Sequence, residues 1–116
     1  MRALASLDDV SFDDNGWVPA IAQDEATKAV LMLGYMNRET LQETLDSGRM
    51  VYWSRSRAER WAKGEGSGNV QRVKQAFYDC EGRSLLFVVE QVGEGACHTG
   101  NFTCYFRELH DLVEPG

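Results

Sequence analysis

The apolar positions of this 116-residue chain fall into short runs separated by glycine, aspartate and asparagine, a pattern typical of a mainly β fold. Runs of strand length lie at 17–23, 28–36, 50–53, 70–78, 85–91 and 103–107. The run 28–36 is continuously apolar over 29–33, which predicts a strand buried on both faces. Pro19 indicates an edge strand or the start of a strand. Residues 1–16 are acidic and end in turn formers, so we expect a short helix and then a turn there. Residues 24–27 are predicted to form a hairpin loop.

One segment has the pattern of an amphipathic helix. Leu41 and Leu45 are four residues apart, Asn37 is a suitable N-cap, and Gly48 follows the last turn as a stop. The pattern predicts a helix over about 38–47. Five or six strands joined by short loops, with one central helix, favour a curved sheet or a partly closed β-barrel with the helix across it.

Composition indicates a single domain over 1–116. Apolar residues make up 43% of the chain and charged residues 26%, and no apolar run approaches the roughly 20 residues of a membrane span. Acidic residues follow the start too closely for a signal peptide, so we expect a cytoplasmic protein without membrane contact. The net charge of −6 counts against general nucleic-acid binding, but 49–74 contains seven basic and two acidic residues, which would suit a localised anionic ligand.

The three cysteines cannot all pair with one another, so a metal site or catalysis explains them better than a disulfide framework. Three protein ligands with an open fourth position are typical of a catalytic zinc site. Cys97 lies among glycines and polar residues, which favours a functional role. Cys104 precedes Tyr105 and Phe106, so it fits a small buried side chain as well as a metal ligand. Cys80 lies on a separate segment.

The segment 61–69, Trp-Ala-Lys-Gly-Glu-Gly-Ser-Gly-Asn, alternates glycine with polar residues and follows Arg55 and Arg57. Backbone N–H groups made accessible by glycine, the Ser67 hydroxyl, and the charges of Lys63 and the two arginines would suit a phosphate. The spacing matches neither a P-loop nor a dinucleotide-binding fingerprint. The alternative is a flexible, solvated loop, which this segment taken alone favours.

His98 is one of two histidines and neighbours a candidate metal ligand. An imidazole in this position can act as a general base near neutral pH. It can also be a fourth zinc ligand or a hydrogen-bonded structural residue. His110, in the acidic tail, is expected to be exposed. Tyr52, Trp53 and Trp61 could stack on a base, although large aromatic residues in a small domain are more often part of the core.

Four motifs together resemble phosphoribosyl-AMP cyclohydrolase. They are Tyr-Trp-Ser-Arg-Ser-Arg at 52–57, the segment 61–69, Asp-Cys-Glu at 79–81, and Cys-His-Thr-Gly at 97–100 with Cys104. They occur in the family's order within roughly 30–107. The resemblance implies a homodimeric hydrolase of histidine biosynthesis that opens the adenine ring of N1-(5-phosphoribosyl)-AMP and uses zinc and magnesium.

The resemblance also implies roles for single residues. Cys80 of one subunit and Cys97 and Cys104 of the other would bind zinc, so that the site exists only in the dimer. His98 matches the family's proposed general base. The expected substrate-binding residues are Arg55, Arg57, Lys63, Glu65, Ser67 and Gly68.

One position departs from the family's pattern. The family has three aspartates spaced by two, whereas this chain has Asp79, Glu81 and Arg83. Magnesium prefers several oxygen ligands in near-octahedral geometry. The departure predicts loose magnesium binding through Asp79 and Glu81, or an Arg83 guanidinium that partly replaces the ion.

Other functions fit the sequence less well. An adenine or cytosine deaminase requires His-x-Glu followed by Pro-Cys-x-x-Cys, and the sequence has neither. A zinc-stabilised nucleotide- or RNA-binding module could use the basic stretch, but overall acidity and the absence of an RNP-like or knuckle motif count against it. A degenerate paralogue with an altered substrate stays open because of Arg83.

Overall fold

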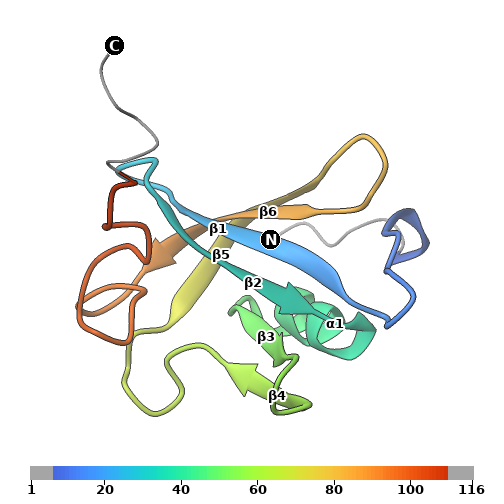
Figure 1. Cartoon of the computed structure of the whole chain (residues 1–116), viewed down its shortest axis with the longest axis horizontal. Helices are drawn as coiled ribbons and strands as arrows, with labels where there is room; N and C mark the ends of the chain where they lie inside the picture. Colours follow the sequence, from blue (N-terminus) through green and yellow to red (C-terminus); the bar gives the residue numbers. More distant parts are fainter. Residues whose placement is uncertain (1–6, 110–116) are drawn as a thin grey trace.

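A computed structural model of the chain describes residues 7–109 (Figure 1). Within this range the chain forms two sheets, one α-helix and one short 3-10 helix. The elements in chain order are η1 (Leu7–Asp9), β1 (Val18–Asp24), β2 (Val30–Met36), α1 (Arg38–Ser47), β3 (Val51–Ser54), β4 (Glu59–Ala62), β5 (Gln71–Tyr78) and β6 (Leu85–Gln91).

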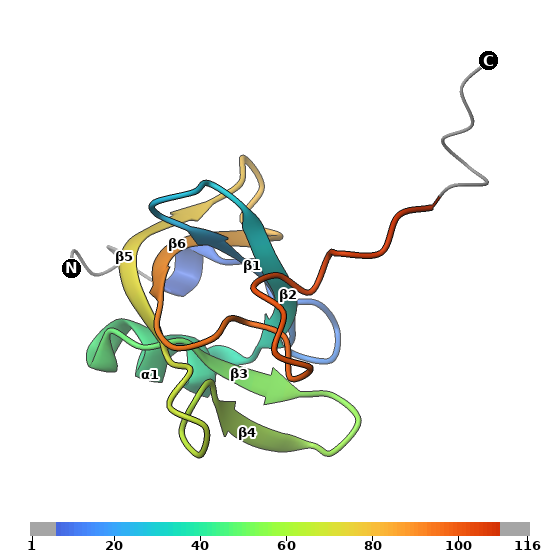
Figure 2. The ribbon, with the colours of Figure 1, turned by 90° about the vertical axis from the view of Figure 1, so that its left-hand side faces the viewer.

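The larger sheet has the strand order β2-β1-β6-β5, and β3 and β4 form a separate two-stranded sheet. β1 runs parallel to β6, and the other neighbours are antiparallel. Figure 2 shows the larger sheet as an arch whose concave side faces α1, β3 and β4. The mainly β fold with one helix is therefore confirmed. The partly closed barrel is wrong, because β2 and β5 end the larger sheet without pairing to each other. Homodimeric assembly stays a prediction.

The hydrophobic core fills the concave side of the arch. Alternate residues of the two central strands point into it, and Leu41, Met50 and Tyr52 reach it from below the sheet, all fully buried. The inward residues of the central strands are Val18, Ala20 and Ala22 of β1 and Leu85, Phe87 and Val89 of β6. This alternation follows from the two-residue period of a strand.

Helix α1 has the predicted bounds because both of its ends are capped locally. Asn37 Oδ1 accepts from Thr40 N–H at 2.9 Å, and Thr40 Oγ1 accepts from Asn37 N–H at 3.0 Å. At the C-terminus Gly48 is left-handed and donates to the Thr44 carbonyl. Thr44 Oγ1 also accepts from Val51 N–H at 3.0 Å, which joins the helix to the start of β3.

Two expectations about single strands need correction. β2 is not buried on both faces, because it lies at the sheet's edge and its outward Val30 and Leu33 are 46% and 42% exposed. β1 is an interior strand, so the edge alternative for Pro19 is wrong. Pro19 lies one residue before pairing with β6 begins, as expected for the start of a strand.

The segment 103–107 was predicted to be a strand and is not. Its bonds to the sheet lie at the beginning of β2, where Cys104 N–H donates to the Leu31 carbonyl at 2.8 Å and Thr103 Oγ1 donates to the Val30 carbonyl at 2.6 Å. β4 was not predicted from the sequence, because its mostly exposed residues show no apolar alternation. The expected short helix and turn before β1 are confirmed by η1 and by the Gly16 N–H bond to the Asp13 carbonyl. His110 lies outside the described residues.

Among residues 7–109, no helix is long and apolar enough to cross a membrane.

Candidate functional site

A pocket of about 570 Å³ lies between the glycine-rich loop that follows β4 and the segment around Cys97. Its volume falls in the range of small-molecule sites. It joins the predicted residues Lys63, Glu65 and Ser67 to Cys97 and His98. The lining residues are Arg60, Trp61, Ala62, Lys63, Gly64, Glu65, Gly66, Ser67, Asn69, Cys97 and His98.

The glycine-rich loop is closed by its own backbone. Gly68 N–H donates to the Gly64 carbonyl at 2.8 Å, and Glu65 N–H donates to the Ala62 carbonyl at 3.2 Å. Gly64 has φ +80°, and a Cβ there would collide with the backbone of Asn69 and its neighbour. Any larger residue at 64 would therefore open the loop. Gly68 does not line the pocket but shapes the loop that does.

A buried polar network supports this loop from below. Tyr52 Oη donates to Gln71 Oε1 at 2.7 Å, and Gln71 Nε2 donates to Gln91 Oε1 at 2.9 Å. Gln91 Nε2 in turn donates to the Asn69 carbonyl at 3.1 Å. Burial raises the pKa of Tyr52, so its hydroxyl stays protonated as a donor. The network links β3, β5 and β6 to the end of the loop.

Lys63 is buried and holds the segment that carries Cys97. Its Nζ donates to the Ala96 carbonyl at 2.5 Å, one residue before Cys97. Burial lowers the pKa of Lys63, and the charges of the Cys104 and Cys97 sulfurs oppose that effect. The sequence predicts Lys63 as a positive charge for a ligand and gives no sign of this internal partner. The ammonium group both fixes the segment and places positive charge beside the two sulfurs.

Cys97 and Cys104 lie together at one end of the sheet, with their thiol groups in contact. A tight turn brings them there, closed by Cys97 N–H bonding to the Asn101 carbonyl at 3.1 Å. Cys97 Sγ lies 2.9 Å from Thr99 Oγ1, and hydrogen bonds from Thr99 lower the pKa of Cys97. Burial raises the pKa of Cys104, which also packs against the core. Two adjacent sulfurs, one of which has a lowered pKa, suit a soft metal such as zinc.

Cys80 does not join this pair within one chain. It is exposed on the loop before β6, whereas Cys97 and Cys104 follow that strand, and Figure 1 shows the two loops on opposite sides of the molecule. A seven-residue strand alone spans roughly 20 Å. Among the described residues, no three His, Cys, Asp or Glu side chains are grouped so that they could hold a metal ion. His98 is exposed at the pocket wall beside Cys97.

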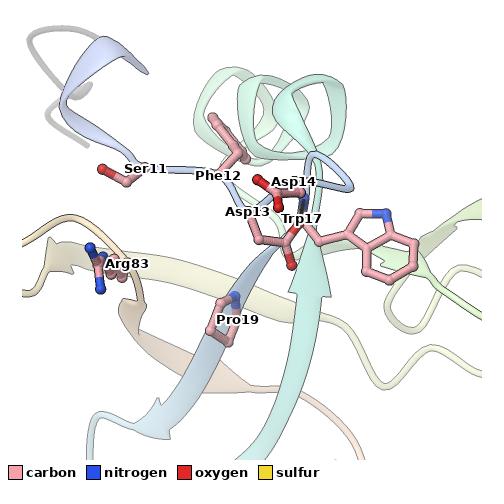
Figure 3. Close-up of a pocket in the computed structure, with 7 residues that line it drawn as sticks. All are labelled: Ser11, Phe12, Asp13, Asp14, Trp17, Pro19 and Arg83. Atoms are coloured by element: carbon pink, nitrogen blue, oxygen red, sulfur yellow. Dashed lines mark hydrogen bonds between the residues drawn. The ribbon is translucent and has the colours of Figure 1, made fainter.

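The Asp79 carboxylate organises the loop between β5 and β6. It accepts from Ser84 Oγ at 2.7 Å, from Arg83 N–H at 2.8 Å and from Glu81 N–H at 3.2 Å, and these bonds lower the pKa of Asp79. The Arg83 guanidinium lies 3.8 Å from the Glu81 carboxylate, with both side chains exposed. Arg83 also borders a second pocket of about 470 Å³, opposite Trp17 and Pro19 (Figure 3).

Arg55 and Arg57 do not line the pocket beside His98. They lie at the tip of the β3–β4 hairpin, and Lys63 lies at its other end. The Arg55 guanidinium stacks 3.6 Å from the centre of the Tyr35 ring and 5.7 Å from that of Trp17. Arg57 lies 3.8 Å from the Glu59 carboxylate.

Arg60 and Asn69 line the pocket but were not among the predicted site residues. Arg60 forms a two-pronged ion pair with Glu43 of α1, at 2.5 and 2.7 Å, which lowers the pKa of Glu43 and raises that of Arg60. The sequence offered one sign that these two residues belong to the site, namely their position. Arg60 directly precedes the glycine-rich segment, and Asn69 ends it.

The sequence matches a family model described as phosphoribosyl-AMP cyclohydrolase over residues 32–106. A Salinibacter ruber protein named phosphoribosyl-AMP cyclohydrolase is 59% identical over 105 residues, which cover 90% of this chain and 82% of that protein. An Archaeoglobus fulgidus protein of the same name is 54% identical over 101 residues, 87% of this chain and 93% of that protein. The histidine biosynthesis bifunctional protein HisIE of Thermosynechococcus vestitus is 56% identical over 111 residues, 94% of this chain but 52% of that protein. The chain thus spans about half of this bifunctional relative.

Proposed function

Because the chain belongs to the phosphoribosyl-AMP cyclohydrolase family, we propose that it hydrolyses the N1–C6 bond of the adenine ring of N1-(5-phosphoribosyl)-AMP in histidine biosynthesis. The observation that supports this most is the pocket that gathers Lys63, Glu65 and Ser67 around Cys97 and His98. These residues come from two motifs about 30 positions apart in the sequence.

The reaction adds water to a ring carbon. The ribosyl group on N1 makes the purine cation-like and C6 electrophilic. Water adds to C6 and loses one proton to a base. As the N1–C6 bond breaks, the hydroxyl on C6 becomes the carbonyl oxygen, its proton is released, and N1 takes up a proton as it leaves. The exocyclic amine stays on C6 as part of a carboxamide. The site must therefore orient one water toward C6, accept its proton and stabilise charge near the leaving nitrogen.

His98 is the proposed general base. It is exposed on the pocket wall, where its imidazole can take the proton of the attacking water and then supply one to N1. Lys63 acts as a positioning residue, because its bond to the Ala96 carbonyl holds the backbone that carries His98. The backbone N–H groups of the glycine-rich loop and the Ser67 hydroxyl are proposed to bind a substrate phosphate.

Zinc is proposed to bind Cys97 and Cys104 of one subunit together with Cys80 of a second. When bound, it would supply a Lewis acid that makes the attacking water more acidic. Support comes from the paired sulfurs of Cys97 and Cys104 and from the position of Cys80 at the far end of β6. The same geometry supports homodimeric assembly, since one chain does not bring the three thiols together.

Magnesium binding at Asp79 and Glu81 is proposed to be weak. The Asp79 oxygens already accept three hydrogen bonds from their own loop. The Arg83 guanidinium lies near Glu81 and places a positive charge where the ion would need another oxygen ligand. Arg55 and Arg57, far from the pocket along the hairpin, are proposed to bind substrate only if a second subunit brings them to it.

The test is a continuous ultraviolet assay of ring opening on phosphoribosyl-AMP. The protein is stripped of metal, then given zinc, with and without magnesium. Zinc-dependent turnover with little response to magnesium is expected. A folded, zinc-loaded protein without turnover would overturn the proposed activity and favour a paralogue with another substrate.

A further inference from the structure

The pocket between the glycine-rich loop and the segment around Cys97 needs a cation if it is to hold a phosphate. The proposed substrate, N1-(5-phosphoribosyl)-AMP, carries two phosphate monoesters, each with roughly two negative charges near neutral pH. Backbone N–H groups and the Ser67 hydroxyl supply hydrogen bonds but no net charge. Besides His98, the basic side chains that line this pocket within residues 7–109 are those of Lys63 and Arg60.

The ammonium group of Lys63 is already used inside the protein. Its Nζ donates to the Ala96 carbonyl at 2.5 Å, and the residue is only 9% exposed. Its charge also acts on the sulfurs of Cys97 and Cys104. A phosphate could take over this ammonium group only by breaking the bond that holds the Cys97 segment. The better candidate is therefore the other cation of the pocket.

Glu43 of α1 holds one edge of the Arg60 guanidinium and leaves the other edge available. Arg60 Nε donates to Glu43 Oε1 at 2.7 Å, and Arg60 Nη2 donates to Glu43 Oε2 at 2.5 Å. A guanidinium has five N–H donors, so these two bonds leave three, two of them on Nη1. The Arg60 side chain is 46% exposed, so an anion can reach it. Because the fork to Glu43 already orders this side chain, little further freedom is lost when an anion binds.

The available edge of Arg60 faces the glycine-rich loop. Arg60 Nη1 lies 3.8 Å from Glu65 Oε2, and both residues line the pocket. This separation is too long for a hydrogen bond, and the Glu65 side chain is 68% exposed. A loose, exposed ion pair of this kind contributes little free energy, whereas hydrogen bonds from arginine to phosphate are strong. A phosphate can therefore displace the Glu65 carboxylate from this edge.

We propose that Arg60 is the cation that binds a substrate phosphate in this pocket, while Glu43 keeps its guanidinium in place. This inference rests on the proposed function, because the ring-opening substrate supplies the phosphate. Arg60 and Ser67 line the same pocket, so the guanidinium adds charge to the hydrogen bonds of the glycine-rich loop. Arg55 and Arg57, the arginines that the sequence motifs favour, do not line it. Either phosphate of the substrate has the chemistry that Arg60 recognises.

Ligands with and without a phosphate isolate this contact. AMP and adenosine differ only in the phosphate of the adenylate half, and ribose 5-phosphate presents the phosphate of the group on N1. Isothermal titration calorimetry of the zinc-loaded protein in magnesium-free buffer gives the dissociation constants. The wild type should bind AMP about 10- to 100-fold more tightly than adenosine, or bind ribose 5-phosphate measurably. Arg60→Met should remove most of this phosphate-dependent affinity and leave the affinity for adenosine within about two-fold.

Two further variants separate the phosphate contact from a purely structural role of Arg60. Arg72→Met is the matched control, because Arg72 is a half-exposed arginine 3.7 Å from the Glu90 carboxylate and does not line the pocket. It should leave every affinity within about two-fold of the wild type. Arg60→Lys keeps the charge but not the fork to Glu43, so it should restore only part of the affinity for phosphate.

The results also tell the two phosphates apart. A loss confined to AMP assigns the adenylate phosphate to Arg60, and a loss confined to ribose 5-phosphate assigns the phosphate of the N1 substituent. The proposal is overturned if Arg60→Met weakens AMP and adenosine equally, if it changes neither AMP nor ribose 5-phosphate binding, or if phosphate gives the wild type no gain with either ligand.

These outcomes are distinct from the fate of the proposed activity. An inactive wild type whose phosphate-dependent affinity disappears in Arg60→Met would refute ring opening alone. A wild type that opens the ring, but whose ligand affinities do not respond to Arg60→Met, would refute the role of Arg60 and leave the activity standing. If both hold, Arg60→Met should raise KM more than it lowers kcat, because the phosphate contact is made in the bound substrate as well as in the transition state.

Discussion

Removing the Tyr52 hydroxyl should destabilise the fold and loosen the glycine-rich loop that follows β4. Tyr52 and Gln71 are fully buried, and their hydrogen bond is 2.7 Å long. Tyr52→Phe leaves Gln71 Oε1 without that donor in a site closed to water, which costs about 1–3 kcal/mol. For a domain of this size the loss lowers Tm by roughly 3–15 °C. Because Gln91 continues the network to the Asn69 carbonyl, KM should rise as well.

Differential scanning calorimetry at one fixed protein concentration measures the effect, because Tm of the proposed dimer would depend on concentration. Tyr105→Phe is the matched control, because its side chain is 60% exposed and the same change there should leave Tm unaltered. If Tyr52→Phe and the control both melt within about 1 °C of the wild type, the buried hydrogen bond does not stabilise the loop and the reasoning fails.

Further substitutions test the individual roles of the site residues. His98→Ala should lower kcat by about 10²–10⁴-fold with zinc content unchanged by metal analysis, and a near-wild-type rate would remove His98 from the mechanism. Lys63→Met should weaken zinc retention and kcat together, because the Cys97 segment loses its support, whereas a rise in KM alone would indicate a substrate contact instead. Arg60 holds the pKa of Glu43 below its ordinary value of 4.5, so the pair stabilises the fold above that pH and the gain is lost as pH falls through the lowered pKa. Glu43→Gln should therefore flatten the acid side of a Tm–pH profile, and an unchanged profile would contradict this. Calorimetric titration should show weak magnesium binding that Arg83→Asp strengthens, and tight stoichiometric binding by the wild type would refute the proposed effect of Arg83.

Local signals in the sequence were sufficient for part of this structure. The helix could be bounded to the residue because Asn37 and Gly48 cap it within their own turns. The bounds of β4 could not be predicted, because its charged residues form a strand only by pairing with β3. The segment 103–107 has strand-like residues, but its backbone finds only a few bonds at the beginning of β2. Propensity indicates a strand, and tertiary pairing decides whether one forms.

The candidate site, like the fold, could be predicted from the sequence only in part. Lys63, Ser67 and His98, from two separate motifs, line one pocket, and their roles there stay predictions. Their internal partners were not predictable, because the bond from Lys63 to Ala96 joins residues 33 positions apart. Arg55 sits close to the glycine-rich segment in sequence, yet the hairpin turns it toward Tyr35. Spacing likewise said nothing about Cys80, whose separation from the other thiols follows from the course of β6.

The most direct test of the account is subunit complementation in the ring-opening assay. The variants Cys80→Ala and His98→Ala are each expected to be inactive as homodimers. In a mixed dimer isolated with two different affinity tags, one site combines wild-type Cys97, His98 and Cys104 of the first chain with wild-type Cys80 of the second. The account predicts about half of the wild-type activity per dimer, because one of two equivalent sites is intact. A mixed dimer as inactive as its parents would contradict a catalytic site shared between two copies of this chain.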